Sequence, residues 1–350
     1  MARVAVGARA ASAFRGVAAG TGRTLLVLAL TFFGLLLVTF LIGRVVPIDP
    51  VLAAVGDRAS AETYARARAE LGLDLPLYQQ FAIYVGKVLQ GDFGRSVLTS
   101  NPVLTDIGRF FPATLELATL ATILGVGIGV PLGVIAAARQ GRWQDQVIRV
   151  VGLLGYSIPV FWLGLVGLLV FYARLGWVAG PGRVDVGFND IVEPMTGLIL
   201  LDSLMEGEGE VFANALSHLV LPAAILGYFS LAYVSRMTRS FMIDQLRQEY
   251  IVTARVKGIA ERRVVWRHAF GNVMLPLVTV VALSYANLLE GSVLTETVFA
   301  WPGIGAYITN SLLNADMNAV LGGTIVVGAV FIGLNMASDL LYRLLDPRAR

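Results

Sequence analysis

The sequence predicts an all-α polytopic membrane protein with six transmembrane helices. Of its 350 residues, 56% are hydrophobic and only 15% are charged, and the mean hydropathy is +0.72, far above that of a typical globular domain. Six runs of 20 to 25 residues contain no Asp, Glu, Lys or Arg. The basic residues gather in segments on one side of these runs, as expected for a chain that crosses a bilayer repeatedly.

Each of the six runs is long enough to span the membrane. A helix needs about 20 apolar residues to cross the hydrocarbon core, because backbone polar groups cannot be left unpaired there. The first run exceeds the usual apolar region of a signal peptide and lacks a small-residue cleavage site, so we expect an uncleaved span. The short apolar run 195–201 is expected to cap the outer side. The predicted spans are 24–43, 117–138, 150–173, 211–235, 269–289 and 317–338.

Charge placement predicts the orientation. The segments 1–23, 139–149, 236–268 and 339–350 together hold 18 basic and 6 acidic residues, whereas the rest of the chain holds 9 basic and 18 acidic residues. Basic loops stay in the cytosol, so both termini and the long loop are expected to be cytoplasmic. Segment 290–316 has no basic residue, as expected of an outer loop.

These boundaries divide the chain into successive regions. They are a cytoplasmic tail (1–23), the first transmembrane segment (24–46), an outer loop region with short helices (47–112), a five-helix core (113–342) that includes a cytoplasmic loop (236–272), and a cytoplasmic tail (343–350).

Two short helices are expected in the long outer loop, over 61–71 and 77–90. The second ends at Gly91, a residue suited to the left-handed conformation after a helix. Packing over the outer mouth and docking of an external partner are both open roles for these helices. The apolar stripe of the second helix comprises Leu77, Phe81, Tyr84 and Val88.

Three glycines at four-residue spacing, Gly125, Gly129 and Gly133, share one face of the second span. A glycine face lets another helix approach closely within the membrane. We therefore expect helix packing here rather than a functional site.

Composition excludes most catalytic chemistry. The chain has no cysteine and only two histidines, His218 and His268, too few for a thiolate nucleophile or an imidazole metal cluster. It also has no glycine-rich loop ending in Gly-Lys-Ser or Gly-Lys-Thr that could hold nucleotide phosphates. We expect a protein that is not an enzyme, has no metal site or cofactor of its own and binds no nucleic acid.

The long inner loop predicts a contact surface. Residues 245–257 are expected to form a helix, Gly258 a turn, and 261–270 the start of a second helix that continues through Pro276. Acidic groups of a soluble protein and anionic lipid headgroups are both open as partners for its charges. The basic residues concerned are Arg255, Lys257, Arg262, Arg263 and Arg267.

This loop carries a specific family resemblance. The pattern YxxTARxKG at 250–258, followed by ERR and RHAxxN, resembles the coupling loop, or EAA loop, of ABC importer permeases of the dipeptide, oligopeptide and nickel branch. Val252 stands where the family's loop has its glutamate, and the distance from Gly258 to Pro276 is longer than in the broader family. Further segments similar to that branch are LGLDLPLYQQF (71–81), GDFGRS (91–96), FPATLELA (111–118), GYSIPVFWLG (155–164), TETVFAWPGIG (295–305) and LLDPRAR (344–350).

The resemblance implies a type I ABC importer permease fold and a peptide importer in a bacterial inner membrane. The long outer loop is similar to that of the B-type permease. The implied partners are a second, C-type permease, two cytosolic ATPases that bind ATP and Mg, and an external binding protein. The implied ATPase-coupling residues are Tyr250, Thr253, Ala254, Arg255, Lys257, Gly258, Glu261, Arg262 and Arg263.

Candidate pathway residues are the polar and amphipathic groups of two spans. Glu290 could meet a peptide ammonium, although a solvated interfacial acid is the favoured interpretation. His218 and Asn335 are favoured as interhelical hydrogen-bonding residues. The candidates are Tyr156, Ser157 and Trp162 in the third span, and Ser284, Tyr285, Asn287 and Glu290 in the fifth.

Other functions remain open at this point. The same importer type could carry nickel, glutathione or oligosaccharides, since selectivity in that branch lies mainly in the external binding protein. A secondary transporter driven by an ion gradient is disfavoured, because no span holds a charged residue and no inverted repeat is evident. A scaffold that merely recruits a soluble protein is the third class.

Overall fold

The computed structural model describes residues 26–43, 51–52, 56, 59–70 and 72–345, and in these ranges its regular secondary structure is helical. The predicted tail 1–23 and residues 346–350, which make up most of the predicted tail 343–350 and of its LLDPRAR segment, lie outside the described residues. For the described part of the chain, the all-α prediction is confirmed.

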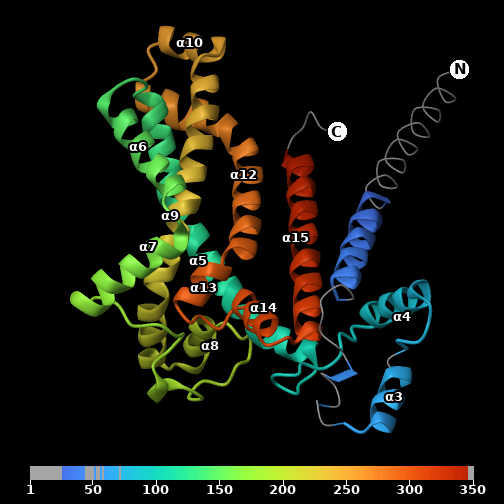
Figure 1. Ribbon diagram of the computed structural model, residues 1–350. Coiled ribbons are helices and arrows are strands. Elements are labelled where there is room, and N and C mark those ends of the chain that lie inside the picture. Colours follow the sequence, from blue (N-terminus) through green and yellow to red (C-terminus); the bar gives the residue numbers. More distant parts are fainter. Residues whose placement is uncertain (1–25, 44–50, 53–55, 57–58, 71, 346–350) are drawn as a thin grey trace, which may run out of the picture.

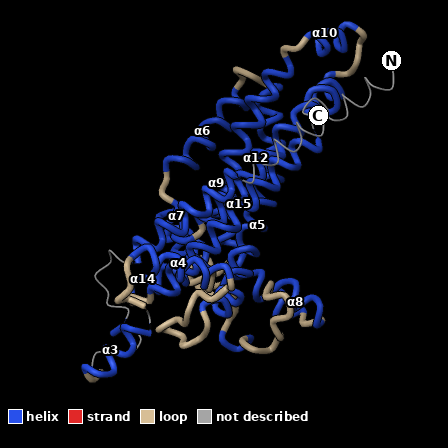
Figure 2. The backbone as a smooth tube through the Cα atoms, turned by 90° about the vertical axis from the view of Figure 1, so that its right-hand side faces the viewer, coloured by secondary structure: helices blue, strands red, loops and turns tan. Residues whose placement is uncertain are grey.

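Five helices of the described chain are long and apolar enough to cross a membrane. They run from an end that carries α10 (Glu249–Val256) to an opposite end of short helices (Figure 1). Figure 2 shows the same elongated arrangement from the side. The five are Leu26–Gly43, α5 (Val103–Ala138), α9 (Gly209–Leu246), the continuous helix Glu261–Gly291, and the Met317–Ser338 part of α15 (Met317–Leu345).

The predicted third span, 150–173, is wrong as a single helix. The chain forms α6 (Trp143–Ser157) and then α7 (Val160–Gly167), which continues into the π-helix η1 (Leu168–Arg174). Between α6 and the helix formed by α7 and η1 the direction changes by 100°. The break is at Ile158, which is extended because the residue before Pro159 is driven out of the helical region. Among the described residues the candidate spans therefore number five, or six if this bent pair is one broken span.

The second span begins earlier than its apolar run. The helix α5 starts at Val103 and passes through Pro112 without ending, so the predicted boundary between outer loop and core at 112 falls inside a helix. The two acidic residues of this first part have polar partners: Asp106 accepts a hydrogen bond from Asn101 Nδ2 at 3.1 Å, and Glu116 binds Arg183. Hydropathy alone did not predict this part of the helix, because it contains charged residues. The fold accommodates the two acidic ones through their polar contacts.

The glycine face of α5 packs against α9. A Cβ added to Gly125 would lie 2.5 Å from Ser230 Oγ, and one added to Gly133 would lie 2.6 Å from the carbonyl oxygen of Ser235. At Gly129 the nearest atom is the carbonyl oxygen of Leu231, at 3.1 Å. Only glycine permits this approach, so the prediction of a packing role is confirmed.

The helices expected in the outer loop are present as α3 (Ala61–Glu70) and α4 (Leu77–Leu89). Phe81 and Tyr84 of α4 pack on the first span, where Tyr84 Oη lies 2.9 Å from Thr39 Oγ1. Leu77 does not join the predicted stripe, because it is 62% exposed at the start of the helix.

Short helices complete the outer end. The expected outer cap at 195–201 forms only in part, because α8 (Ile199–Glu206) starts four residues later. The residues before it are held as a loop by Asp202, which accepts hydrogen bonds from the backbone N–H groups of Thr196 and Gly197, each at 2.9 Å. The remaining outer elements are η2 (Val186–Phe188), α13 (Val293–Val298) and α14 (Ile304–Leu313).

Replacing Gly133 by alanine is expected to destabilise the protein by about 1 to 3 kcal/mol, because the new methyl group would press on the backbone of α9. The matched control is Gly127→Ala on the same helix, where an added Cβ meets nothing within 4 Å. The midpoint of thermal unfolding in detergent measures the difference. Equal midpoints for the two variants would contradict close packing of α5 on α9.

Candidate functional site

The predicted inner loop is a corner made of short helices. After α9 ends at Leu246, Gln248 is extended (φ −74°, ψ 149°), so α10 begins at Glu249 and not at 245 as predicted. Beyond Gly258, α11 (Glu261–Arg263), a π-helical turn η3 (Val264–Ala269) and α12 (Phe270–Gly291) form one continuous helix. The predicted order of helix, glycine turn and helix is therefore present, and α10 lies at the tip of the molecule (Figure 1).

The inner face of α10 is buried against the body of the bundle. Ile251 is fully buried and Ala254 nearly so. Both belong to one apolar cluster with residues of α5, α9, η3 and α12. A displacement of α10 is therefore expected to move its neighbours, because buried side chains in such a cluster are closely packed. The other buried members are Val134, Ala137, Val234, Met242, Val264, Val265, Ala269, Val273, Leu277 and Val280.

The Gly258 turn is fixed by backbone and side-chain contacts. Gly258 has φ +74°, a conformation that L side chains rarely adopt, and its N–H donates to the carbonyl oxygen of Arg255 at 2.9 Å. Across the turn, the Arg255 guanidinium donates two hydrogen bonds to Glu261, at 3.1 and 2.7 Å. This hydrogen bonding raises the pKa of Arg255. Both side chains are largely exposed, so the pair stabilises the turn modestly.

Tyr250 joins three helices. Its hydroxyl donates to Gln245 Oε1 of α9 at 2.7 Å and accepts from Asn272 Nδ2 of α12 at 2.9 Å. Neither Gln245 nor Asn272 is among the coupling residues that the sequence predicted. Asn272 is the last residue of the RHAxxN pattern, so the signal was present but its structural role was not evident.

The outer face of α10 is open. Val252 and Val256, one helical turn apart, are 54% and 83% exposed. The predicted coupling residues Thr253, Lys257, Arg262 and Arg263 are also exposed. Among the ion pairs of the described residues, none involves Lys257, Arg262 or Arg263. The corner thus presents an apolar pair beside unpaired cations.

A second inner contact was not predicted. Asp145 near the start of α6 is 2% exposed and accepts two hydrogen bonds from the Arg239 guanidinium of α9, at 2.6 and 2.9 Å. The backbone N–H of Gly141 donates to the same carboxylate at 2.9 Å. This bidentate pair holds the inner end of α6 on α9. The two residues are far apart in the sequence, which offers no pairing signal.

The candidate pathway residues on α6 and α7 lie at the surface of the chain. Tyr156 is 49% exposed, with the Arg236 guanidinium 4.9 Å from its ring centre, and Trp162 is 50% exposed. Ser157 donates to the carbonyl oxygen of Leu153 within its own helix, at 3.0 Å.

The candidates on α12 have different surroundings. Ser284 is buried, with its hydroxyl 2.9 Å from Ser230 Oγ of α9, and Tyr285 Oη lies 3.0 Å from Thr119 Oγ1 of α5. Asn287 and Glu290 are exposed. No hydrogen bond or ring contact of the described residues joins these four to the candidates on α6 and α7. Their shared role in a pathway stays a prediction.

Two buried glutamates organise the end of the molecule opposite α10. Glu296, fully buried, accepts hydrogen bonds from Thr114 Oγ1 at 2.6 Å, Ser292 Oγ at 2.8 Å and the N–H of Ala306 at 2.9 Å. A Cβ added to Gly303 would lie 2.3 Å from its carboxyl carbon. The TETVFAWPGIG and FPATLELA segments therefore meet around one carboxylate, and sequence reasoning assigned neither glutamate a role.

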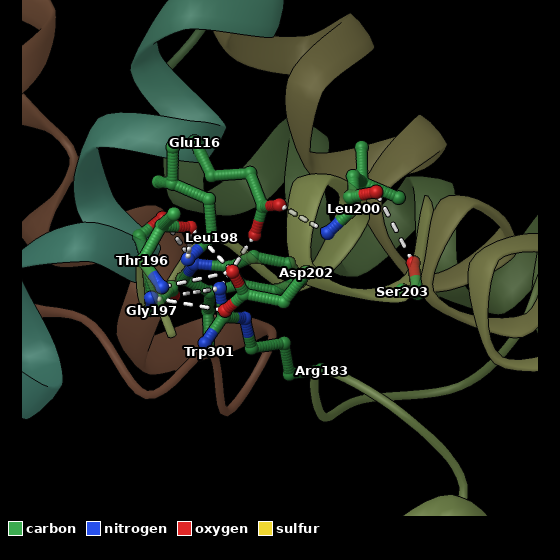
Figure 3. A network of polar contacts seen from close by, with 10 residues as sticks. Glu116, Arg183, Thr196, Gly197, Leu198, Leu200, Asp202, Ser203 and Trp301 are labelled. Carbon is green, nitrogen blue, oxygen red and sulfur yellow. Dashed lines mark hydrogen bonds and ion pairs between the residues drawn. The ribbon is translucent and has the colours of Figure 1, made fainter. Parts of the chain in front are cut away.

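Glu116 is the second of these acids and is shown in Figure 3. It accepts from Arg183 at 2.7 Å and from the N–H of Leu200 at 2.8 Å, so it ties α5 to the first turn of α8 and to the loop that carries Arg183. Trp301, also fully buried, donates from Nε1 to the carbonyl oxygen of Ala113 at 2.9 Å. His218 belongs to the same end, where its ring lies 2.9 Å from the carbonyl oxygen of Gly180. It thus binds a loop and not a neighbouring span.

Comparison with known proteins shows which families and which solved structure this chain resembles. Residues 129–350 match the family described as binding-protein-dependent transport system inner membrane component, and residues 21–118 match its N-terminal counterpart. A solved structure described as inward facing conformations of the MetNI methionine ABC transporter is similar in fold, with a TM-score of 0.50 and 16% identity over 67% of this chain and 93% of that chain.

Several curated relatives are similar over almost the whole chain. The probable D,D-dipeptide transport system permease protein DdpB of Escherichia coli K12 is 45% identical, covering 92% of this chain and 94% of the relative. The di/tripeptide permease DppB of Pseudomonas aeruginosa is 43% identical, covering 94% and 97%. The dipeptide permease DppB of Escherichia coli K12 is 42% identical, covering 91% and 95%.

Replacing Thr114 by valine is expected to destabilise the protein by about 1 to 3 kcal/mol, because it removes a donor from the buried Glu296 carboxylate. Thr105→Val, the same change at an exposed position of α5, is the control. Thermal unfolding in detergent measures both. A Thr114→Val protein as stable as the control would show that this hydrogen bond is not needed at the outer end.

Proposed function

This chain belongs to the family of inner membrane components of binding-protein-dependent transport systems, and on that premise we propose that it transports dipeptides or other short peptides. It is a non-catalytic permease subunit of an ABC transport system, in which a partner ATPase handles ATP and a binding protein is a further partner. The observation that carries the substrate class is the identity of 42% to 45%, over more than 90% of the chain, to permeases of dipeptide transport systems.

In this proposal, the ATPase drives the permease through its contact with α10. The exposed Val252 and Val256 would be covered by an apolar recess of the cytosolic ATPase, and the unpaired Arg262 and Arg263 would meet acidic groups at its rim. The exposed Val252 supports this use, because an apolar contact can replace the glutamate that the family's loop carries at this position. The remaining predicted coupling residues fix the turn, through Gly258 and the Arg255–Glu261 pair.

Movement would pass from α10 into the spans. Ile251 and Ala254 share a buried cluster with α9 and α12, and Tyr250 bonds to both of these helices. Closure of the ATPases would then displace α10 and rotate the two long helices together, so that the pathway opens to either side in turn. A rigid corner suits this role better than a mobile linker.

The complete transporter, as we propose it, pairs this chain with a second, C-type permease and two ATPases. Both termini would be cytoplasmic, on the same side as α10. Five of the seven candidate pathway residues are exposed on this chain, and the exposed ones other than Tyr156, whose ring lies against Arg236, would face the partner permease, which supports a pathway shared between two chains. Membership of an ATPase-served family removes the ion-gradient carrier from consideration.

Uptake by the copurified complex in vesicles tests the proposal. With binding protein outside and ATP inside, we expect uptake of a radiolabelled dipeptide, and none when ATP is omitted. Nickel complexes, glutathione and a maltooligosaccharide are the competing cargoes. Failure of dipeptides together with ATP-driven uptake of one of these would overturn the peptide assignment and leave the permease role intact.

Gly258→Val is expected to reduce ATP-driven uptake at least several-fold, because a β-branched residue at φ +74° strains the turn by roughly 1 to 3 kcal/mol. An added Cβ meets nothing within 4 Å, so strain and not collision is the cause. Gly258→Asn is the control, since asparagine tolerates this conformation. Unchanged uptake by the valine variant would remove the turn from the coupling mechanism.

Reversing charge at Arg262 and Arg263 to glutamate is expected to weaken copurification of the ATPase, because the rim contacts would become repulsive. Arg139→Glu with Arg142→Glu changes the same charge on another exposed inner loop and serves as the control. The ATPase retained per permease in detergent is the measurement. Equal retention by both variants would favour lipid headgroups as the partners of Arg262 and Arg263.

A further inference from the structure

The helices α6 and α9 contact each other at several levels, two of which bound a groove. Toward the membrane centre, a Cβ added to Gly155 would lie 3.0 Å from Ala232 Cβ. Toward the cytosolic end, Asp145 and Arg239 form the bidentate pair described above. Between these contacts lies a groove of about 340 Å³. Its lining includes Ile148, Arg149, Leu153, Tyr156, Ser235 and Arg236.

The groove holds two unneutralised cations. Arg149 and Arg236 are exposed, and no described residue forms an ion pair with either of them. The third arginine, Arg239, is neutralised by Asp145, whose two carboxylate oxygens are already occupied by Arg239 and by the N–H of Gly141. The Arg236 guanidinium is held 4.9 Å from the Tyr156 ring centre, which fixes its position over the groove. Both guanidinium groups therefore lack an anionic partner among the described residues and are placed to bind an anion.

Sequence position puts these cations at the inner membrane surface. The uncharged run of α9 ends at Ser235, so Arg236 stands where hydrocarbon gives way to headgroups. Trp143, at the start of α6 and 70% exposed, suits the same interface. Toward the membrane centre the walls become apolar, with Val150 and Leu153. The groove is cationic at headgroup level and apolar below it.

We propose that this groove binds an anionic phospholipid of the cytoplasmic leaflet. Its phosphate lies between Arg149 and Arg236, which match phosphate oxygens in a forked, charge-assisted geometry. One acyl chain follows the apolar wall between α6 and α9. A soluble anion would use only the arginines and leave that wall uncovered, whereas a lipid satisfies both parts. The assignment is independent of which substrate the transporter carries.

Native mass spectrometry of the detergent-solubilised transporter complex, titrated with phosphatidylglycerol or phosphatidylcholine, tests this site. The wild type is expected to prefer phosphatidylglycerol. Arg149→Gln with Arg236→Gln is expected to weaken that binding about tenfold or more. Gly152→Leu keeps both arginines but fills the groove, and it is expected to weaken binding as well. An added Cβ at Gly152 meets nothing within 4 Å, so the fold accommodates the change.

Arg139→Gln with Arg142→Gln is the matched control, because it removes two charges from the same inner side but outside the groove lining. It is expected to bind phosphatidylglycerol like the wild type. Equal weakening by the control pair would reduce the effect to general surface charge and overturn the site. Unchanged binding in both groove variants would also overturn it. Displacement of the lipid by millimolar dipeptide or inorganic phosphate would assign the arginines to a soluble anion instead.

Discussion

Burial of one face of α10 is the constraint on which the rest of the proposed mechanism depends. Ile251 is fully buried and Ala254 nearly so, and their cluster reaches α5, α9 and α12. A helix at the tip of the molecule that was merely tethered would move without moving the spans. Because α10 is packed into the same apolar core as the spans, a force applied to its exposed face must act on the long helices.

The opposite end of the molecule is held by polar contacts. Glu296 and Glu116 are buried carboxylates whose hydrogen bonds join α5 to α13, α14 and the first turn of α8. Removing a single partner leaves a buried charge poorly compensated, so such networks resist deformation. Between the two ends, the glycine face brings α5 and α9 into backbone contact. The α5–α9 pair is therefore a closely packed unit that links the two ends of the described fold.

Much of the fold could be predicted from the sequence, because apolar runs and glycine spacing are local signals. The helix of the outer loop up to Glu70 and the glycine turn at Gly258 are examples. The failures have physical causes. The helix α6 ends before Ile158, because Ile158 precedes Pro159 and is extended. The helix α5 begins earlier than its apolar run, and its Glu116 is paired with Arg183, which lies far along the sequence. The Asp145–Arg239 pair and the Tyr250–Asn272 bond also join distant segments, which a single sequence cannot reveal. The substrate class came from the resemblance to a known family, because physical reasoning from the residues alone does not indicate which solute is carried.

The most direct test is the number of peptides transported per ATP hydrolysed by the reconstituted complex carrying Ile251→Ala. The substitution opens a cavity under α10 and loosens its packing by about 2 to 5 kcal/mol without altering the exposed face that would meet the ATPase. Coupling through α10 predicts that ATP hydrolysis persists while transport per ATP falls several-fold, with Ile251→Val close to the wild type. Transport per ATP equal to the wild type in the alanine variant would contradict it.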